Sequence, residues 1–217
     1  MKQSLLFLLI IHSFLFVNCR GNRHEKVVEA KSYDRKCSVF RSIPLTNLPQ
    51  REILFLGHSL INEFLVDEYI PHGDSIVYIN MGIGGDDTKG CFNRRYLAFD
   101  RNPSLIIMNL GINDLLNSEP IDTITYYYGQ ILDDAKKRGL SLIICSIIPN
   151  SKHFEKDIRK VNSFLKRKCF EHQYRYIDLF TPMNKDGALA PKYNCGDNTH
   201  LTGAGYTLWA DTLKKYI

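Results

Sequence analysis

Residues 105–114 of this 217-residue chain read Leu-Ile-Ile-Met-Asn-Leu-Gly-Ile-Asn-Asp. The run Leu105–Leu110 is apolar on both faces, which is typical of a strand buried between two layers of helices. Gly111 and the polar residues Asn113 and Asp114 follow it directly, where turn residues are expected. This stretch favours an α/β fold in which a polar loop follows a central parallel strand.

The same pattern extends to either side of this stretch. The predicted strands, in chain order, are Ile53–Leu56, Ile76–Ile79, Leu105–Leu110, Leu142–Ile148 and Tyr174–Ile177. Helical periodicity separates them, with clear apolar stripes over residues 121–135 and 158–169 and a last helix that Thr202 can cap. Such alternation implies right-handed crossovers and a parallel sheet covered on both faces. We therefore predict, over residues 51–217, a single five-stranded, doubly wound α/β domain of flavodoxin-like order 2-1-3-4-5.

The composition is that of an ordinary globular domain. Hydrophobic residues make up 44% and charged residues 24% of the chain, which excludes wholesale disorder. The 28 Lys and Arg against 23 Asp and Glu give a net charge of +5, and the basic residues are scattered. The tightest run, Lys166-Arg167-Lys168, is interpreted as a solvated helix face, with a basic patch for an anionic surface as the alternative. We predict no nucleic-acid partner.

The first residues resemble an export signal. Lys2 precedes an apolar run, Ser4–Val17, which is too short to span a membrane and fits the core of a signal peptide. We predict a signal peptide over residues 1–18 and a polar tether over residues 19–50. The protein is expected to be exported, and to be secreted, periplasmic or anchored by lipid at the cell envelope.

Cys19 is the candidate lipid anchor. Phe16-Val17-Asn18-Cys19 resembles a bacterial lipobox, with Asn18 where Gly or Ala is usual, so lipidation of Cys19 and ordinary secretion both stay open. Among the other cysteines, Cys145 and Cys169 are expected to be buried hydrophobes. Cys91 and Cys195 flank candidate site loops and could oxidise to a disulfide in an exported protein. No spacing of Cys and His suggests zinc.

Four polar loops follow the predicted strands or precede the last helix. They are Gly57-His58-Ser59-Leu60, Gly82-Ile83-Gly84-Gly85-Asp86, Gly111-Ile112-Asn113-Asp114 and Asp197-Asn198-Thr199-His200-Leu201. In a sheet of this order, ligands bind beyond the carboxyl ends of the strands, where the strand order reverses. Each loop alone is a weak signal, but their joint order along the chain is hard to obtain by chance.

Over residues 50–217 these blocks resemble the SGNH hydrolases, also called GDSL esterases and lipases. The resemblance implies Ser59 as nucleophile, Gly85 and Asn113 as the second-block and third-block residues, and Asp197 with His200 as the last block. The segment Asn80-Met81-Gly82-Ile83-Gly84-Gly85-Asp86 looks most like the branch of platelet-activating-factor acetylhydrolases and lysophospholipases. The chain departs from the family in having His58 where Asp is usual.

The chemistry of these residue types agrees with the resemblance. A serine hydroxyl needs a base, and His200 can be that base if Asp197, three residues earlier, fixes its tautomer. The backbone N–H of Ser59, at the start of a helix expected over Leu60–Tyr69, can donate to a substrate oxyanion. The N–H of Gly85 and the side-chain amide of Asn113 would complete that oxyanion hole. Ile61 breaks a Gly-x-Ser-x-Gly elbow, which argues against the α/β-hydrolase family.

Structural roles are the alternatives for the same residues. Ser59 could simply cap a helix, the glycines could form a tight turn, and Asn113 could cap its own turn. Asp86, Asp87 and Asp114 are expected in turns and caps rather than around a cation. His58 is interpreted as an exposed loop filler, with a second ionisable group as the alternative. Asp87 replaces the last Gly of a dinucleotide loop, and no P-loop is present, so no cofactor is predicted.

We predict a serine ester hydrolase that forms an acyl-enzyme, and the branch resemblance points to short acyl groups on a sugar or lipid. Two alternatives are retained: an O-acetyltransferase acting on a cell-envelope glycan, and a non-catalytic surface-binding protein on the same fold. The segments Lys89–Arg101 and Pro182–Cys195 are the expected walls of the substrate groove. The acyl length, the alcohol and the oligomeric state are not readable from the sequence.

Overall fold

The structure, a computed structural model, describes residues 32–46 and 51–217. The described residues divide into two units, residues 32–43 and residues 44–46 with 51–217. In the first unit, residues 32–42 form a helix that the sequence analysis did not predict within the tether. The predicted signal peptide and Cys19 lie outside the described residues, so both stay predictions.

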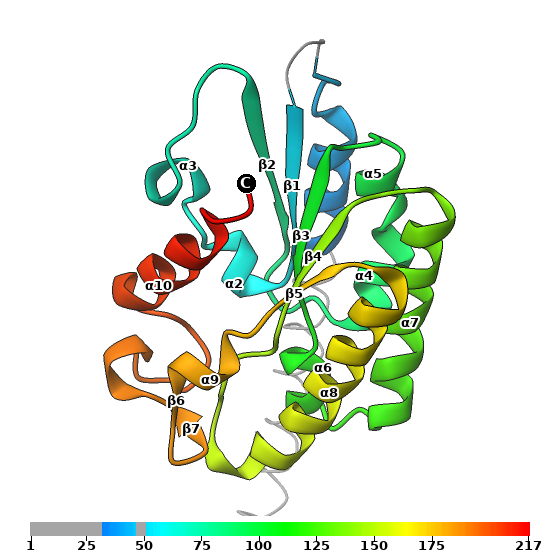
Figure 1. The fold of residues 1–217 in the computed structure, drawn as a ribbon. Helices are drawn as coiled ribbons and strands as arrows, with labels where there is room; N and C mark the ends of the chain where they lie inside the picture. Colours follow the sequence, from blue (N-terminus) through cyan, green and yellow to red (C-terminus); the bar gives the residue numbers. More distant parts are fainter. Residues whose placement is uncertain (1–31, 47–50) are drawn as a thin grey trace, which may run out of the picture. The chain divides into compact units, whose positions relative to one another are not determined.

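The second unit is built on a five-stranded parallel sheet (Figure 1). Its strands are β1 (Arg51–Gly57), β2 (Ile76–Gly82), β3 (Leu105–Asn109), β4 (Leu142–Cys145) and β5 (Arg175–Ile177). Their order is β2-β1-β3-β4-β5, which confirms the predicted doubly wound topology. The fourth strand is shorter than predicted, because hydrogen-bonded pairing ends at Cys145 and residues 146–150 continue as a loop.

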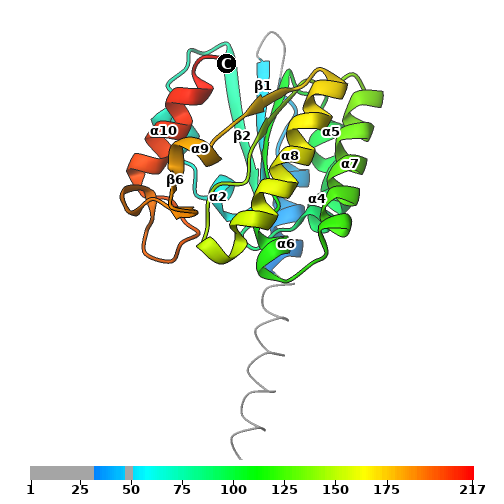
Figure 2. The same ribbon diagram turned by 60° about the horizontal axis from the view of Figure 1, so that its bottom comes forward.

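Helices cover both faces of the sheet (Figures 1 and 2). One face carries α2 (Ser59–Asn62), α3 (Val66–Tyr69) and α10 (Gly203–Leu213). The other carries α4 (Thr88–Arg94), α5 (Tyr96–Phe99), α7 (Ile121–Lys137) and α8 (Glu155–His172). The connecting segments contain further short elements: α6 (Ile112–Leu116), η1 (Lys152–Phe154), α9 (Phe180–Met183), the β6–β7 hairpin (Asn184–Lys185 and Ala188–Leu189) and η2 (Pro191–Tyr193).

The core follows from the alternation of side chains along the strands. Ile53 and Phe55 of β1 join the cluster under α2, α3 and α10, and Leu54 points to the opposite face, all of them fully buried. In that cluster the Trp209 ring stacks on Phe64 with centroids 5.2 Å apart. Burial of such side chains contributes roughly 1.5–3 kcal/mol each and supplies most of the driving force for folding.

The predicted helical stripes are buried as expected. The buried positions are Ile124, Tyr128, Ile131, Leu132 and Ala135 in α7; Ile158, Val161, Leu165 and Cys169 in α8; and Tyr206, Trp209, Ala210 and Leu213 in α10. Thr202 caps α10 by accepting the Gly205 N–H at 3.4 Å, as predicted. These interactions fix α10 directly after the loop that carries His200.

The single helix predicted over residues 60–69 is wrong: the chain forms α2 and α3 with a break between them. Asn80 of β2 causes the break, because its side-chain amide donates to the carbonyls of Ile61 at 2.6 Å and Phe64 at 3.1 Å. Those two carbonyls would otherwise accept the next helical hydrogen bonds. The result is a one-turn helix that begins at Ser59 and is anchored to the second strand.

Gly82 allows this close approach of α2 to the end of β2. A Cβ atom at Gly82 would lie 2.2 Å from the backbone nitrogen of Asn62 and 2.6 Å from its Cα. These are backbone atoms that no side-chain rotation can move. The small residue at the end of β2 therefore decides where the turn with Ser59 lies.

We expect Gly82→Ala to lower the free energy of unfolding by at least about 1–3 kcal/mol, because the added methyl forces the two backbones apart. The matched control is Gly84→Ala, where an added Cβ meets nothing within 4 Å. That control should stay within about 1 kcal/mol of the parent protein. Urea denaturation measures both. Equal stability of the two variants would contradict the close-packing argument.

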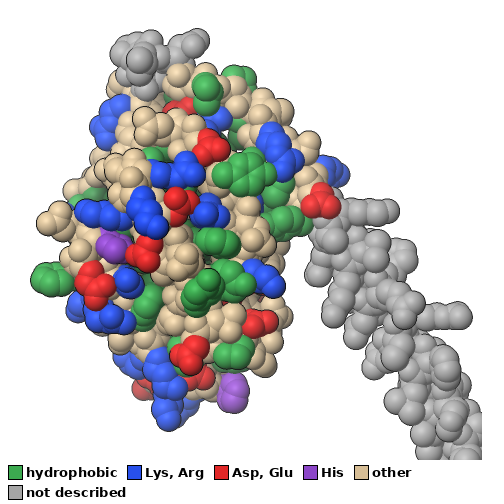
Figure 3. All heavy atoms as spheres, turned by 90° about the vertical axis from the view of Figure 1, so that its right-hand side faces the viewer, with side chains coloured by type: hydrophobic (Ala, Val, Ile, Leu, Met, Phe, Trp, Pro, Cys, Tyr) green, Lys and Arg blue, Asp and Glu red, His purple; other side chains and the backbone are tan. Residues whose placement is uncertain are grey.

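The surface of the protein carries charges of both signs. The face in Figure 3 shows Lys and Arg interspersed with Asp and Glu. On α8, Arg167 forms an ion pair with Glu171 at 3.3 Å, and Lys168 lies 3.4 Å from the same carboxylate. Within residues 32–46 and 51–217, no helix has the length and apolar character needed to cross a membrane.

Candidate active site

Ser59 is the first residue of α2 and lies at the carboxyl end of β1, two residues after Gly57. The N-cap of this helix is His58, so the alternative that Ser59 serves as the cap does not hold. Its side chain is only partly buried and its hydroxyl is hydrogen-bonded to an imidazole from the other end of the domain. The strand thus places the hydroxyl at the edge of the sheet where ligands of doubly wound folds bind.

Ser59, His200 and Asp197 form a continuous hydrogen-bonded series. Ser59 Oγ lies 2.9 Å from His200 Nε2, although the two residues are 141 positions apart. His200 Nδ1 lies 2.6 Å from Asp197 Oδ2. A carboxylate at Nδ1 accepts its proton, which leaves Nε2 to accept the serine hydroxyl proton. The structure therefore brings together the three residues that the sequence analysis singled out, in the order that nucleophilic chemistry requires.

Asp197 is held by its own loop. Its Oδ1 accepts the backbone N–H of His200 at 2.8 Å and of Thr199 at 2.9 Å. These backbone hydrogen bonds, together with the bond to the imidazole, keep the pKa of Asp197 well below its usual value although its side chain is 51% exposed. The carboxylate therefore stays ionised and keeps the imidazole oriented.

Asn150, in the loop after β4, anchors the loop that carries Asp197 and was missed by the sequence analysis. Its buried side-chain amide donates to Thr199 Oγ1 at 2.9 Å, and its backbone carbonyl accepts the N–H of Leu189 in the β6–β7 hairpin. The signal in the sequence was a polar residue directly after an apolar run, the same signal that marked the other loops. Asn150 fixes the loop with Asp197 and His200 to the sheet.

The two further oxyanion-hole candidates lie in neighbouring loops. The second-block loop is joined to β1 by the Ile83 N–H, which donates to the Gly57 carbonyl at 3.0 Å. The Asn113 side chain donates to the Asp86 carbonyl at 2.9 Å, so it reaches across to another loop instead of capping its own turn. Within the described chain, the backbone N–H groups of Ser59 and Gly85 donate to no protein acceptor. They are therefore available to a substrate oxygen.

Arg94 of α4 holds these loops in place. The sequence analysis also missed it, because a single arginine on a helix gives no sequence signal of a buried role. Its guanidinium forms a 2.6 Å ion pair with Asp86 and donates to the carbonyls of Met81 at 2.9 Å and Gly57 at 3.0 Å. Both charged side chains are buried. Burial raises the pKa of Asp86 to about 6, and the nearby Arg94 partly offsets that effect.

The remaining acidic residues of these loops have structural roles, as predicted. Asp87 caps α4 by accepting the Gly90 N–H at 2.6 Å, and Asp114 accepts the Thr88 N–H at 3.1 Å. In the part of the chain that the structure describes, no cluster of three or more His, Cys, Asp or Glu side chains could hold a metal ion.

His58 is buried, so its interpretation as an exposed loop filler is wrong. Only 1% of the residue is exposed, and its Nδ1 accepts the Leu60 N–H at 3.3 Å, which caps α2. Asn109 of β3 donates its amide to the Ser146 carbonyl at 2.8 Å, and its interaction with the imidazole favours the protonated form of His58. Burial, with a smaller contribution from His200, lowers the pKa of His58 to about 4. The ring is therefore neutral near pH 7, and protonation of Nδ1 would remove the cap.

The disulfide between Cys91 and Cys195 is also wrong. Both are free thiols, the first buried inside α4 and the second exposed in the loop before Asp197. Burial raises the pKa of Cys91 to about 12. Cys145 and Cys169 are buried as predicted, and burial likewise raises the pKa of each to about 12.

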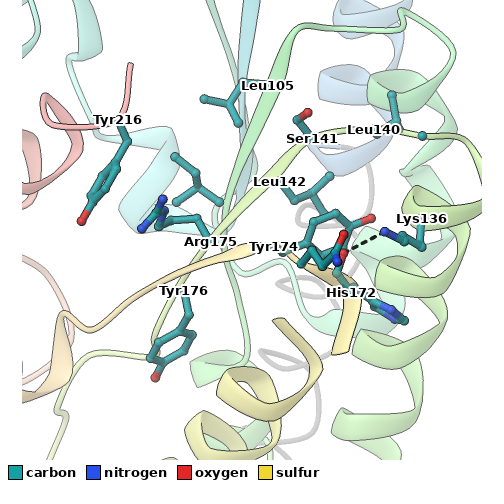
Figure 4. Close-up of a pocket in the computed structure, with 13 residues that line it drawn as sticks. Leu105, Lys136, Leu140, Ser141, Leu142, His172, Tyr174, Arg175, Tyr176 and Tyr216 are labelled. Atoms are coloured by element: carbon teal, nitrogen blue, oxygen red, sulfur yellow. Dashed lines mark hydrogen bonds between the residues drawn. The ribbon is translucent and has the colours of Figure 1, made fainter. Parts of the chain in front are cut away.

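A cavity of about 600 Å³ lies at the opposite edge of the sheet (Figure 4). It is lined by Leu105, Leu142 and Arg175, the first residues of β3, β4 and β5, and so faces away from the catalytic loops. Lys136 on its wall donates to the His172 carbonyl at 3.0 Å. None of the candidate catalytic residues lines this cavity.

The fold, with serine, histidine and aspartate hydrogen-bonded in series at the carboxyl edge of its sheet, is that of an SGNH-type hydrolase. The model of the GDSL-like lipase/acylhydrolase family matches residues 57–208. The chain belongs to this family.

Individual relatives agree with this assignment. An arylesterase from Vibrio mimicus is 30% identical over 84 residues, which cover 38% of this chain and 42% of the arylesterase, so the match spans less than half of that curated relative. A Streptococcus pneumonia structure described as a candidate platelet activating factor has a TM-score of 0.78 at 19% identity, covering 91% of this chain and 98% of that chain. An acetylxylan esterase from Geobacillus stearothermophilus, solved as a catalytic mutant, has a TM-score of 0.65 at 14% identity, covering 76% and 93%. These two structures show the shared fold.

His58 should make the stability of the protein depend on pH. Its folded-state pKa of about 4 lies below the ordinary histidine value of about 6.5, so the unfolded chain binds more protons between these values. The free energy of unfolding should therefore fall by up to about 3 kcal/mol through His58 as the pH drops from 6.5 to 4. Asp86, whose folded-state pKa is raised, acts in the opposite direction over much of this range.

The variant His58→Asn separates the two effects, because asparagine can still cap α2 but does not titrate. Urea denaturation of both proteins between pH 7 and pH 4 is the measurement. We expect a smaller loss of stability toward acid pH in the variant, since Asp86 is common to both. Parallel curves for the two proteins would show that His58 is not a buried neutral group.

Proposed function

We propose that this protein is a serine-dependent carboxylic ester hydrolase that acts through an acyl-enzyme intermediate on short acyl esters. The observation that carries the proposal is the 2.9 Å contact between Ser59 Oγ and His200 Nε2, combined with the 2.6 Å contact between His200 Nδ1 and Asp197. Membership of a lipase/acylhydrolase family supports the reaction class. The acetylxylan esterase and arylesterase among the relatives support ester bonds as the target.

In the proposed acylation step, the proton moves from Ser59 to His200 and then to the leaving alcohol. His200 Nε2 takes the hydroxyl proton as Ser59 Oγ bonds to the ester carbonyl carbon, and the carbonyl oxygen becomes an oxyanion. The N–H groups of Ser59 and Gly85 and the amide of Asn113 donate to it. His200 then returns the proton to the alcohol oxygen as the carbon–oxygen ester bond breaks, leaving the acyl group on Ser59.

Deacylation repeats the sequence with water. His200 Nε2 takes a proton from a water molecule whose oxygen bonds to the acyl carbon, and the same donors hold the second oxyanion. The proton returns to Ser59 Oγ as the acid leaves. Each oxyanion donor typically contributes about 3–4 kcal/mol to such a barrier, so the three loops together would supply a large share of the catalysis.

Ser59→Ala should lower the turnover of p-nitrophenyl acetate by roughly 10⁴-fold or more, because the nucleophile is removed. The melting temperature should hardly change, since the hydroxyl is partly exposed and its recorded partner is the catalytic imidazole. The control is Ser163→Ala, an exposed serine on α8 that donates only to the Arg159 carbonyl. A fluorophosphonate probe should label the parent and the control but not Ser59→Ala.

Retained activity in Ser59→Ala would remove the proposal, and absence of probe labelling in the folded parent would favour a non-catalytic binding protein. Product analysis separates hydrolysis from transfer. With an acetylated glycan as donor, free acetate is expected, whereas acetyl groups gained by an acceptor glycan would identify an O-acetyltransferase.

We propose further that the protein is exported and anchored at the cell envelope through a lipidated Cys19, on the basis of its amino-terminal sequence. In a bacterial host, labelled palmitate should be incorporated into the parent protein and into Cys195→Ala, but not into Cys19→Ala. Cys195 is the matched control because it is an exposed free thiol. If all three proteins appear in the medium as unlabelled mature chains, the protein is secreted and the proposed anchoring is wrong. If they stay in the cytoplasm at full length, the proposed export is wrong as well.

A further inference from the structure

Glu63 brings a carboxylate to the catalytic histidine from an unexpected direction. It caps the carboxyl end of α2, four residues after the nucleophile, and its backbone N–H donates to the Ser59 carbonyl at 2.9 Å. Its Oε1 lies 3.9 Å from His200 Nε2. The one-turn helix that delivers the serine hydroxyl to this nitrogen therefore delivers a negative charge to it as well.

In the described part of the chain, no neighbouring lysine or arginine neutralises this carboxylate. Within the described residues, neither Glu63 nor Asp197 has a Lys or Arg nitrogen within 4 Å, and the ion-pair partner recorded for each is His200. The Glu63 side chain is 49% exposed, so a substrate can reach it. Two carboxylates thus flank one imidazole, one on each side of the ring, and only Asp197 is needed to orient it.

The geometry places Glu63 on the alcohol side of a bound ester. In the proposed reaction Nε2 passes its proton to the leaving alcohol oxygen, which requires an approach of about 3 Å. With Glu63 Oε1 at 3.9 Å from the same nitrogen, the leaving oxygen lies within about 7 Å of the carboxylate. The acyl carbonyl, in contrast, points toward the oxyanion donors of the loops after β2 and β3.

We propose that Glu63 is a specificity determinant that favours esters whose alcohol carries a positive charge a few bonds from the ester oxygen, such as an ammonium group. The inference rests on the proposed ester hydrolysis. For an ammonium group at a separation of about 5–7 Å in a half-exposed site, a full negative charge favours a cationic alcohol over a neutral one by about two- to five-fold. Because the site is open to solvent, added salt weakens the preference.

The test compares two esters of the same shape, acetylcholine and 3,3-dimethylbutyl acetate, in which a carbon replaces the ammonium nitrogen. The readout is the ratio of their kcat/KM values, which cancels any general effect of a variant on turnover. Glu63→Gln should lower this ratio two- to five-fold. The matched control Glu68→Gln removes the same charge from an exposed residue on α3 and should leave the ratio unchanged.

Salt gives a second, independent readout. Raising the ionic strength from 20 to 500 mM should lower the ratio for the parent protein and for Glu68→Gln, and should hardly change it for Glu63→Gln. An unchanged ratio in Glu63→Gln, or an equal loss on both esters, would overturn the proposal and assign Glu63 a structural role. Hydrolysis of p-nitrophenyl acetate by the folded parent without turnover of either of these two esters would overturn this inference alone. Failure on all three esters would overturn ester hydrolysis itself.

Discussion

Arg94 is buried next to the loops that carry Ser59 and Gly85, and its guanidinium connects three separate segments of the chain. It donates to Gly57 at the end of β1 and to Met81 near the end of β2, and it pairs with Asp86 in the loop that follows. Removing two charges from water costs several kcal/mol per ion, and such a pair is tolerated only where its remaining donors are also satisfied. Because the guanidinium donors have fixed directions, the pair sets the distance between the nucleophile turn and the loop with the oxyanion donors.

The site consists of a buried half and an exposed half. The nucleophile turn and the oxyanion loops are held by the sheet, by the close contact at Gly82 and by the buried His58. The acid–base half lies on one loop between η2 and α10, where Asp197 and His200 form a local unit that is partly open to solvent. Asn150 holds this loop through Thr199, and Thr202 joins its end to α10. In the proposed mechanism, the rigid half stabilises the transition state and the loop transfers the proton.

The sequence predicts those features that depend on repeated or ordered patterns. Buried parallel strands carry enough apolar residues to be located, and their alternation with helices leaves few topologies. Features set by one long-range contact were not predictable. The break after α2 comes from Asn80, 19 residues away, and the burial of His58 depends on strand β3 packing beside it. The disulfide was predicted wrongly for a similar reason. Cys91 lies on the buried side of α4, and the local sequence does not specify how that helix is oriented.

The exchange of the family's usual Asp for His58 fits the charges that would develop during the proposed reaction. A histidine that accepts the Leu60 N–H through Nδ1 retains the capping function but is neutral, so this position places no negative charge next to Ser59. Positive charge develops instead on His200, and there the two carboxylates, Asp197 and Glu63, are placed. Protonated His58 and protonated His200 also repel each other. In the proposed mechanism, a neutral buried ring next to Ser59 therefore adds no charge repulsion when His200 takes the serine proton.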